Sequence, residues 1–173
     1  MLRKLAATLV AATVLLAGSA GVSSAAPAQP EFRAQWHVSG LTAAQAESLQ
    51  QRVDAVLAAI PGGHQVSATE VRYDGLVVTF DPRSDSNPGT GAQLDVNCSY
   101  EWFCIVVRGT TFSFYECRWW DLTDWIGVSP YNNNQTPGTV FRAYDQNYNQ
   151  VWTSTAPQTG SVDVTPWWHI KPC

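Results

Sequence analysis

Charged residues are scarce in this chain. Only 14% of its 173 residues are Asp, Glu, Lys or Arg, against about 25% in an average soluble protein. Because 45% of the residues are apolar and 12% are aromatic, the chain can bury a core and is not a disordered one. Basic residues are fewer than acidic ones: ten Lys and Arg stand against fourteen Asp and Glu, which gives a net charge of -4. Since phosphate neutralisation requires cationic side chains, this balance argues against a nucleic-acid partner.

Long apolar runs are missing beyond residue 28, where none approaches the roughly 20 residues that cross a bilayer. Residues 1–28 have the pattern of a secretory signal peptide. Arg3 and Lys4 form a basic start, Leu5 to Ala17 is apolar, and small residues at 23–28 offer a cleavage site. We therefore expect a secreted, extracellular protein that has no membrane partner after signal cleavage, and a signal anchor is the alternative for this segment.

The sequence patterns of common enzymes are also missing. It contains no GxSxG elbow, HExxH pair, phosphate loop or dinucleotide fingerprint. A glycosidase-type carboxylate pair is the enzyme alternative, formed by Asp121 with Asp124 or by Glu116 with Asp121. Such enzymes place two carboxyl groups about 5–9 Å apart, and proximity in sequence does not establish that geometry. We predict that the protein is not an enzyme and uses no cofactor or metal.

Four cysteines are present, and all lie in the second half of the chain: Cys98, Cys104, Cys117 and Cys173. Their number is even, and exported proteins meet an oxidising environment, so we expect two disulfides. No close CxxC or histidine pair accompanies them, which argues against a zinc site. Spacing alone leaves three pairings open.

A helix is predicted over Leu41 to Ile60, after which Pro61-Gly62-Gly63 ends it. Thr42 and Gln45 fit a capping box at its start. Its apolar residues recur at helical spacing and form one stripe: Leu49, Val53, Val56, Leu57 and Ile60. Such a stripe requires a partner surface that removes it from water.

Two strands are predicted next, Gln65 to Tyr73 and Leu76 to Phe80, around Asp74-Gly75. This dipeptide accepts the positive φ angles of a type I′ hairpin turn. We expect the helix stripe to pack across this hairpin, so that residues 29–80 form a small structural helix-hairpin unit. Residues 81–96, rich in Pro, Ser, Asp and Gly, are interpreted as a linker.

From residue 97 to residue 173 the pattern predicts an all-β domain, and the fold class is therefore α+β. Five short runs between Gly, Pro or Asn clusters are the expected strands: Trp102 to Arg108, Thr111 to Cys117, Thr139 to Tyr144, Val151 to Thr155 and Val162 to Ile170. Phe112 and Phe114 are expected on one face of their strand, because side chains alternate along a strand. A β domain of about 75 residues has a marginal core, so crosslinks would stabilise it.

Several strings in this order are similar to those of a known family: Gly62 to Ser67, Tyr73 to Val78, Cys98 to Cys104, Asn133 to Thr136, and the terminal Cys173. Together they resemble secreted actinobacterial proteins related to peptidase inhibitor family I36. The inhibitory domain of that family is similar to a βγ-crystallin Greek-key unit.

The resemblance implies a compact Greek-key domain in which Cys98 pairs with Cys104 and Cys117 pairs with Cys173. It also implies inhibition of an extracellular peptidase. Two features depart from the family pattern. The stretch 105–109 lacks the usual aromatic arrangement of the crystallin hairpin, and the string at 132–137 ends in proline, so no calcium site is expected.

The chain has eight tryptophans, and they supply the candidate binding residues. Trp119, Trp120 and Trp125 lie close together, and Trp167-Trp168 is a second pair. Adjacent residues of a strand face opposite sides, so we expect one member of each pair in the core and the other in solvent. Exposed aromatic rings hold sugar rings or peptide side chains. The alternative is that these residues are simply bulky core.

A second candidate surface is the polar segment Gly127 to Gly138, interpreted as a loop, in which Tyr131 lies between Pro130 and Pro137. Prolines favour a stiff segment, and inhibitors present a segment that already has its bound shape. The same composition describes an ordinary connection between strands.

These features predict a monomeric extracellular binding protein that inhibits a peptidase. The alternative is a non-catalytic module that binds polysaccharide or cell wall through its exposed Trp residues. A third interpretation is an envelope or spore-surface component without a small ligand.

Overall fold

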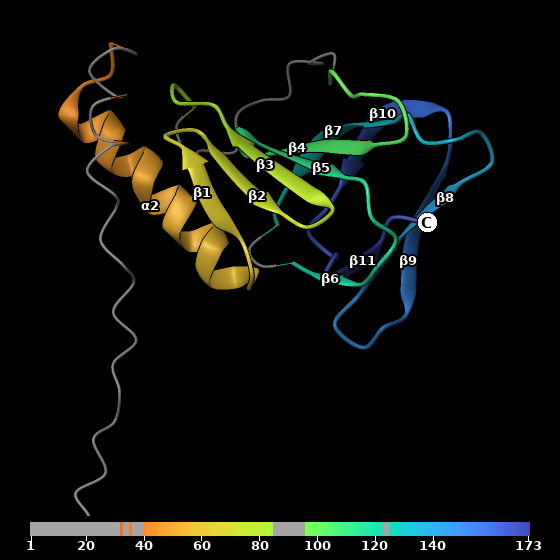
Figure 1. Ribbon diagram of the computed structural model, residues 1–173. Coiled ribbons are helices and arrows are strands. Elements are labelled where there is room, and N and C mark those ends of the chain that lie inside the picture. Colours follow the sequence, from red (N-terminus) through yellow and green to blue (C-terminus); the bar gives the residue numbers. More distant parts are fainter. Residues whose placement is uncertain (1–31, 33–34, 36–39, 85–95, 123–124) are drawn as a thin grey trace, which may run out of the picture.

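The computed structural model describes residues 32, 35, 40–84, 96–122 and 125–173. This part combines a helix with antiparallel sheets, which confirms the α+β class (Figure 1). Its elements, in chain order, are α2 (Ala43–Ala59), β1 (His64–Ser67), β2 (Glu70–Tyr73), β3 (Leu76–Phe80), β4 (Phe103–Val107), β5 (Thr110–Phe114), β6 (Trp120–Asp121), β7 (Val128–Asn133), β8 (Val140–Tyr144), β9 (Gln150–Thr155), β10 (Gln158–Asp163) and β11 (His169–Lys171).

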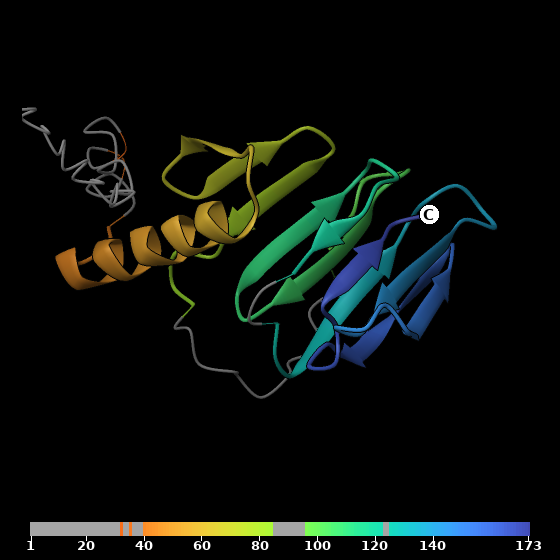
Figure 2. The same ribbon diagram turned by 90° about the horizontal axis from the view of Figure 1, so that it is seen from below.

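The strands form two sheets. One has seven strands in the order β1-β2-β3-β5-β4-β7-β10, and the other has four in the order β6-β11-β8-β9. Figure 2 shows the four-stranded sheet layered against the β5-β4-β7 part of the larger sheet, with α2 lying beside β1 and β2. The register of the large sheet aligns a buried row of side chains across five strands: Val71, Val78, Phe112, Ile105 and Tyr131.

Both α2 and the four-stranded sheet cover this buried face. The Tyr73 hydroxyl donates to the Val56 carbonyl of α2 at 3.3 Å, and the Tyr73 ring meets Trp120 of β6 edge-on at 6.3 Å between centroids. Farther along the sheet, the rings of Phe103 and Phe141 stack at 3.6 Å between centroids. One continuous core therefore joins the helix and both sheets.

The helix forms as predicted. The Thr42 hydroxyl accepts from the Gln45 backbone N–H at 3.2 Å, and the Gln45 side chain accepts from the Thr42 N–H at 2.9 Å, which completes the capping box. Leu49 and Val53 are fully buried, so the helix stripe packs on the sheet as expected. A Cβ atom at Gly63 would overlap the Tyr73 ring, and only glycine allows this close approach after the helix.

The predicted strand Gln65 to Tyr73 is two strands, because the chain turns at residues 68–69 between β1 and β2. The Ser67 hydroxyl accepts from the Thr69 N–H at 3.2 Å, and this local bond competes with continued strand pairing. The predicted hairpin is thus a three-stranded antiparallel unit. Ser67 and Thr69, short polar residues inside the predicted strand, are the sequence feature that indicates this turn.

The turn between β2 and β3 also differs from the prediction. Gly75 has a φ of +78°, whereas Asp74 is not among the residues with positive φ, so the turn is not of type I′. The φ pattern of type I′ occurs instead between β4 and β5, where Arg108 and Gly109 have φ values of 49° and 71°. In the turn between β2 and β3, Gly75 is the one residue with a positive φ.

The large sheet continues from the predicted N-terminal unit into the predicted β domain. β3 pairs with β5 over five residues, from Leu76 opposite Phe114 to Phe80 opposite Thr110. Residues 29–80 and 97–173 therefore contribute neighbouring strands to one sheet. Of the predicted linker at 81–96, residues 85–95 lie outside the described residues.

The segment Gly127 to Gly138 is not a loop, since it contains β7, which lies between β4 and β10. Its inward side chains are polar or aromatic, which hid the strand pattern. Asn133 is buried and donates through Nδ2 to the Ser154 carbonyl at 3.0 Å. Pro130 lies where β7 is paired only with β10, a position that tolerates a missing N–H.

Four of the five strands predicted after residue 97 correspond to β4, β5, β8 and β9. The fifth, Val162 to Ile170, is divided, because β10 ends at Asp163 and β11 begins at His169. Phe112 and Phe114 are both buried on one face of β5, as predicted.

Candidate functional site

The four cysteines form two disulfides, Cys98–Cys104 and Cys117–Cys173, with Cα atoms 5.6 and 5.4 Å apart. This is the pairing that the family resemblance implies. The second bond joins the end of the chain to the segment between β5 and β6. The Arg142 guanidinium donates to the Cys173 carbonyl at 2.8 Å and fixes the same terminus.

Each tryptophan pair is divided between core and surface, as predicted, although Trp119, Trp167 and Trp168 lie just outside β6 and β11 rather than within a strand. Trp120 and Trp167 are buried, whereas Trp119 is 47% exposed and Trp168 is 51% exposed. The buried member of each pair packs against other aromatic rings, with Trp120 on Phe114 at 5.7 Å between centroids. The outer members are the ones available to a ligand.

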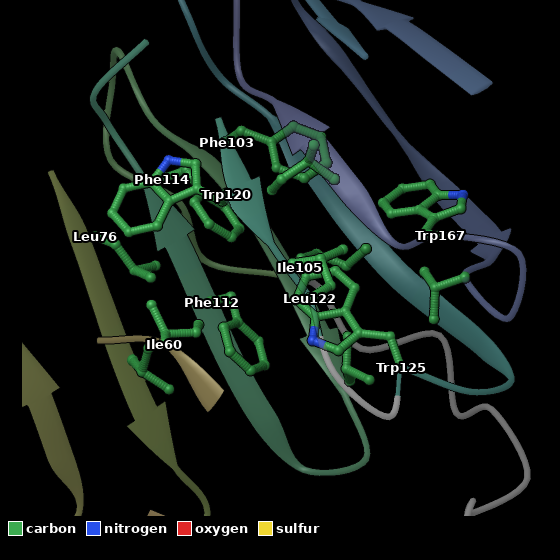
Figure 3. Close-up of a cluster of buried hydrophobic side chains, with 14 of the residues drawn as sticks. Ile60, Leu76, Phe103, Ile105, Phe112, Phe114, Trp120, Leu122, Trp125 and Trp167 are labelled. Atoms are coloured by element: carbon green, nitrogen blue, oxygen red, sulfur yellow. The ribbon is translucent and has the colours of Figure 1, made fainter. Parts of the chain in front are cut away.

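Three of the four predicted binding residues are core residues. Trp120, Trp125 and Tyr131 are buried, and Figure 3 shows Trp120 and Trp125 among Phe112, Phe114 and other apolar side chains. Tyr131 projects inward from β7 and stacks on Phe103 at 5.9 Å between centroids. In this structure these three residues offer no ring surface to a ligand, and Trp119 is the one that does.

Trp119 belongs to a cluster of rings that we call the aromatic face: Trp119, Tyr144, Tyr148 and His169. Ring centroids of Trp119 lie 4.7 Å from Tyr144 and 5.6 Å from Tyr148. Tyr148 stacks on the His169 ring at 3.9 Å with an interplanar angle of 7°. Tyr148 remains 58% exposed.

Strand register places two members of this cluster, Tyr144 and His169, on the outer face of the four-stranded sheet. His169 of β11 lies opposite both Asp121 of β6 and Tyr144 of β8. The next row along the three strands, Trp120, Ile170 and Ala143, is buried. Because side chains alternate between faces, burial of the second row directs the first row outward.

Polar groups border the aromatic face. The His169 Nδ1 lies 2.6 Å from Asp121 Oδ1, so this carboxylate fixes the orientation of the imidazole ring. The Lys171 ammonium lies 6.0 Å from the Trp119 ring centroid. The face thus combines flat apolar rings with the His169 imidazole, the Lys171 ammonium and the Asp121 carboxylate, and the Asp145 carboxylate acts electrostatically on His169.

Tyr148 is carried by a tight turn between β8 and β9. The Asp145 carboxylate accepts from the backbone N–H groups of Asn147 at 2.8 Å and Asn149 at 2.9 Å, and from the Asn149 side chain at 3.0 Å. Hydrogen bonds from Asn149 hold the pKa of Asp145 below its ordinary range. The Tyr148 backbone has a φ of 61°, an uncommon left-handed conformation for a residue with a side chain.

Sequence reasoning missed three members of the aromatic face. Tyr144 follows the alternation of β8 and was predictable as the outward neighbour of buried Ala143. His169 required the pairing of β11 with β6 and β8, strands far apart in sequence. Tyr148 lies in a turn rich in Asp and Asn, where no periodicity indicates a side-chain direction.

These contacts differ from those of a Ser-His-Asp triad. His169 is oriented by Asp121, but among the described residues no serine, threonine or free thiol is hydrogen-bonded to its ring, as a triad nucleophile would be. All four cysteines are in disulfides. Of the carboxylate pairs considered from the sequence, Asp124 lies outside the described residues. Among the described residues, no group of three or more His, Cys, Asp or Glu side chains is placed to hold a metal ion.

A second exposed feature is the turn closed by Cys98–Cys104. Its tip carries Tyr100, which is 60% exposed. The turn is tied to the segment after β7, because Glu101 N–H donates to the Asn134 carbonyl at 2.8 Å and Asn134 Nδ2 donates to the Cys98 carbonyl at 3.0 Å. The crosslink and these bonds hold Tyr100 on a rigid projection.

Comparison of the chain with protein-family models, with curated proteins and with solved structures gave no match. No helix of the described residues is long and apolar enough to cross a membrane.

Proposed function

We propose that this chain is a secreted, monomeric, non-enzymatic binding protein whose aromatic face binds a glycan. The observation that carries this proposal is the gathering of Trp119, Tyr144, Tyr148 and His169 on the outer face of the four-stranded sheet. Large aromatic rings left in solvent cost free energy unless a partner covers them, so a contiguous group of them is a mark of a binding surface. Aromatic rings with polar neighbours suit sugars, which have apolar C–H faces and hydroxyl edges.

The scaffold supports this use. The inner rows of the same strands are packed in the core, and the Cys117–Cys173 bond connects the segment next to Trp119 with the end of the chain. A preorganised surface loses little conformational entropy when a ligand binds. The signal sequence and the two disulfides support an extracellular location, where such bonds persist.

The test is retention of the mature protein on insoluble polysaccharides, with cellulose, chitin and purified bacterial cell wall as separate matrices. We expect the wild type to be retained on at least one matrix and Trp119→Ala to bind about tenfold more weakly, as for a hot-spot ring. Trp168→Ala is the matched control, since it removes a similarly exposed indole that is not part of the aromatic face. Equal retention of wild type and Trp119→Ala on every matrix would overturn the proposal.

The second candidate function is inhibition of an extracellular peptidase, and the rigid Tyr100 turn favours it. Peptidase inhibitors present a segment already fixed in its bound shape, and the Cys98–Cys104 turn has this property. The resemblance to peptidase inhibitor family I36, with its βγ-crystallin-like Greek-key domain, points the same way. Two antiparallel sheets in which β7 pairs with the earlier strand β4 are compatible with that fold.

Titration against a panel of metallo- and serine peptidases tests this candidate. Inhibition at micromolar protein that is lost in Tyr100→Ala and kept in Trp119→Ala would support it and place the site at the turn. Inhibition unaffected by Tyr100→Ala would remove the turn from the mechanism. Retention on glycan without inhibition of any peptidase leaves the aromatic face as the functional surface.

A further inference from the structure

We propose that Tyr148 is the principal sugar-contacting ring of the aromatic face, and that the face selects neutral glycans whose pyranose hydroxyls are equatorial. This inference rests on the proposed glycan-binding function and deepens it. Three features support it: the backbone conformation of Tyr148, the angle between the Tyr148 and Trp119 rings, and the charges around these rings.

The turn that carries Tyr148 is built to fix that ring. Tyr148 has a φ of 61°, and a left-handed residue with a large side chain persists only where its surroundings determine the conformation. Here Tyr148 N–H donates to the Asp145 carbonyl at 3.0 Å, and Asp145 N–H donates to the Asn149 carbonyl at 2.9 Å. The Asp145 carboxylate closes the turn through Asn147 and Asn149. Strained backbone held in this way is typical of functional positions.

The arrangement of the rings defines a platform and a wall. Tyr148 lies flat on His169, with an interplanar angle of 7°, so its ring is supported from one side. Trp119 meets Tyr148 at 79°, with centroids 5.6 Å apart. A sugar that stacks on Tyr148 therefore meets the indole along its edge. We infer a site for one sugar unit, with its face on Tyr148 and one edge against Trp119.

This geometry selects for ring stereochemistry. A pyranose with equatorial hydroxyls, as in glucose and N-acetylglucosamine, presents axial C–H groups on both faces, and these pack against the negative face of an aromatic ring. An axial hydroxyl, as at C2 of mannose, projects from one face and loses a hydrogen bond to water when that face is stacked. A mannose unit can therefore stack with one face only, whereas a gluco-configured unit can stack with either face. The platform therefore favours gluco-configured units.

The charges around the rings select for a neutral ligand. Asp121 borders the face, and its side chain is 77% exposed. The Asp145 carboxylate acts electrostatically on His169, so it is a second negative charge beside the rings. The Lys171 ammonium and the Arg142 guanidinium, whose residues are paired across β11 and β8, balance these two carboxylates. A polyanionic glycan would therefore gain no net electrostatic attraction at this face, whereas a neutral glycan needs none.

Calorimetric titration of the full mature protein with four probes tests the inference: cellohexaose, chitohexaose, β-mannohexaose and alginate. We expect cellohexaose or chitohexaose to bind about twofold more tightly than the mannoside, because a gluco-configured unit has two faces that can stack, and also more tightly than the polyanion. Tyr148→Ala should lose that preferred binding, whereas Tyr148→Phe keeps the ring and most of the affinity. Thermal unfolding midpoints of both variants verify that they are folded.

Asp145 is assigned as a positioning residue, and rescue by a conservative variant separates positioning from general stability. Asp145→Ala removes all three acceptor contacts and should weaken binding as Tyr148→Ala does. Asp145→Asn retains an oxygen for the two backbone N–H groups and should restore most of the affinity. If both variants bind equally weakly at equal thermal stability, the positioning role is overturned.

The outcomes separate this inference from the proposed function. If the wild type binds mannohexaose or alginate as tightly as the gluco-configured probes, or if Tyr148→Ala binds like the wild type, the inference fails and glycan binding stands. If the wild type binds none of the four probes and is not retained on any insoluble polysaccharide, glycan binding itself fails.

Discussion

The two ends of the seven-stranded sheet are held by different means. At the β1-β2-β3 end, α2 covers the sheet and buried residues such as Leu49 and Val53 supply the cohesion, with no disulfide in residues 40–84. At the β4-β7-β10 end, the smaller sheet covers the same face and two disulfides crosslink the chain. The first end is held by apolar burial and hydrogen bonds without a crosslink, and the second combines burial with covalent bonds.

Exposed apolar side chains follow the same division. In residues 40–84 the structure exposes one large hydrophobic side chain, Val66, whereas residues 96–122 and 125–173 expose eight. These eight are Tyr100, Tyr115, Trp119, Ile126, Val128, Tyr148, Val151 and Trp168. A small β unit that diverts large rings to its surface has fewer left for its core, and crosslinks offset that loss. The exposed large apolar side chains of the described residues therefore gather at the crosslinked end.

The largest loss of stability at the crosslinked end should follow removal of the Cys117–Cys173 bond. Cys117→Ala combined with Cys173→Ala should lower the free energy of unfolding by about 4 kcal/mol, because the bond closes a loop with a sequence separation of 56. Urea unfolding followed by tryptophan fluorescence measures the change. The short crosslink is the matched control, and Cys98→Ala with Cys104→Ala should cost only about 2 kcal/mol, since its sequence separation is 6. A larger loss from the short bond would contradict the chain-entropy argument.

At the other end, the largest effect should come from packing. Leu49 of α2 is fully buried, so Leu49→Ala should cost about 3 kcal/mol, through lost burial and the cavity left behind. Hydrogen exchange should show that protection falls in β1 and β2 more than in β8 and β9. Leu57→Ala is the control on the same helix, because Leu57 is only partly buried and its loss should be smaller. Equal loss of protection in all strands would indicate that the two ends unfold as one unit.

The sequence predicted elements whose patterns are local. The helix, its capping box and the burial of Phe112 with Phe114 follow from period and spacing alone. β7 was hidden because its inward positions include Ser129 and Asn133, polar residues whose hydrogen-bond partners come from distant strands. A buried polar residue interrupts the apolar alternation by which a strand is predicted. Its hydrogen-bond partners become apparent only when distant strands are brought together.

The site was partly predictable for the same reason. Alternation predicted that one member of each tryptophan pair would be exposed, but not that in the first pair it would be Trp119. It did not exclude Trp125, which lies outside any regular strand yet packs on Phe112 at 4.7 Å between centroids. The grouping of Trp119 with Tyr148 and His169 depends on the pairing of β11 with β6 and with β8. In these pairings His169 lies opposite Asp121 and Tyr144, which are distant in sequence, and no local pattern specifies them.

The capping box of α2 should make a smaller contribution to stability at the β1-β2-β3 end. Thr42→Ala removes the hydroxyl that accepts from Gln45 and should destabilise the protein by about 1 kcal/mol. Thr42→Ser keeps an acceptor at that position and should recover most of this loss. Thermal unfolding by circular dichroism measures both variants. If Thr42→Ser is as destabilised as Thr42→Ala, the cap hydroxyl is not the cause.

The smallest expected effect concerns pH at the second end. Hydrogen bonds from Asn149 hold the pKa of Asp145 below its ordinary value of 3.8. A carboxyl group whose pKa is lower in the folded state stabilises that state above its unfolded pKa, and the stabilisation is lost as the pH falls through the folded pKa. The Tyr148 turn should therefore remain intact from neutral pH down to 3.8 and loosen only below that value.

Carbon-detected NMR of the carboxyl groups follows this titration directly, together with the contacts between the Tyr148 and His169 rings. Asp163 is the internal control, because hydrogen bonds from Thr165 also lower its pKa and no residue of the aromatic face contributes to that shift. In Asp145→Asn, the acid-induced loss of the Tyr148 contacts should be reduced, while Asp163 titrates as in the wild type. An Asp145 carboxyl that titrates at its ordinary pKa would show that the turn does not hold the charged group, and Tyr148 would then lose the anchor that its left-handed backbone requires.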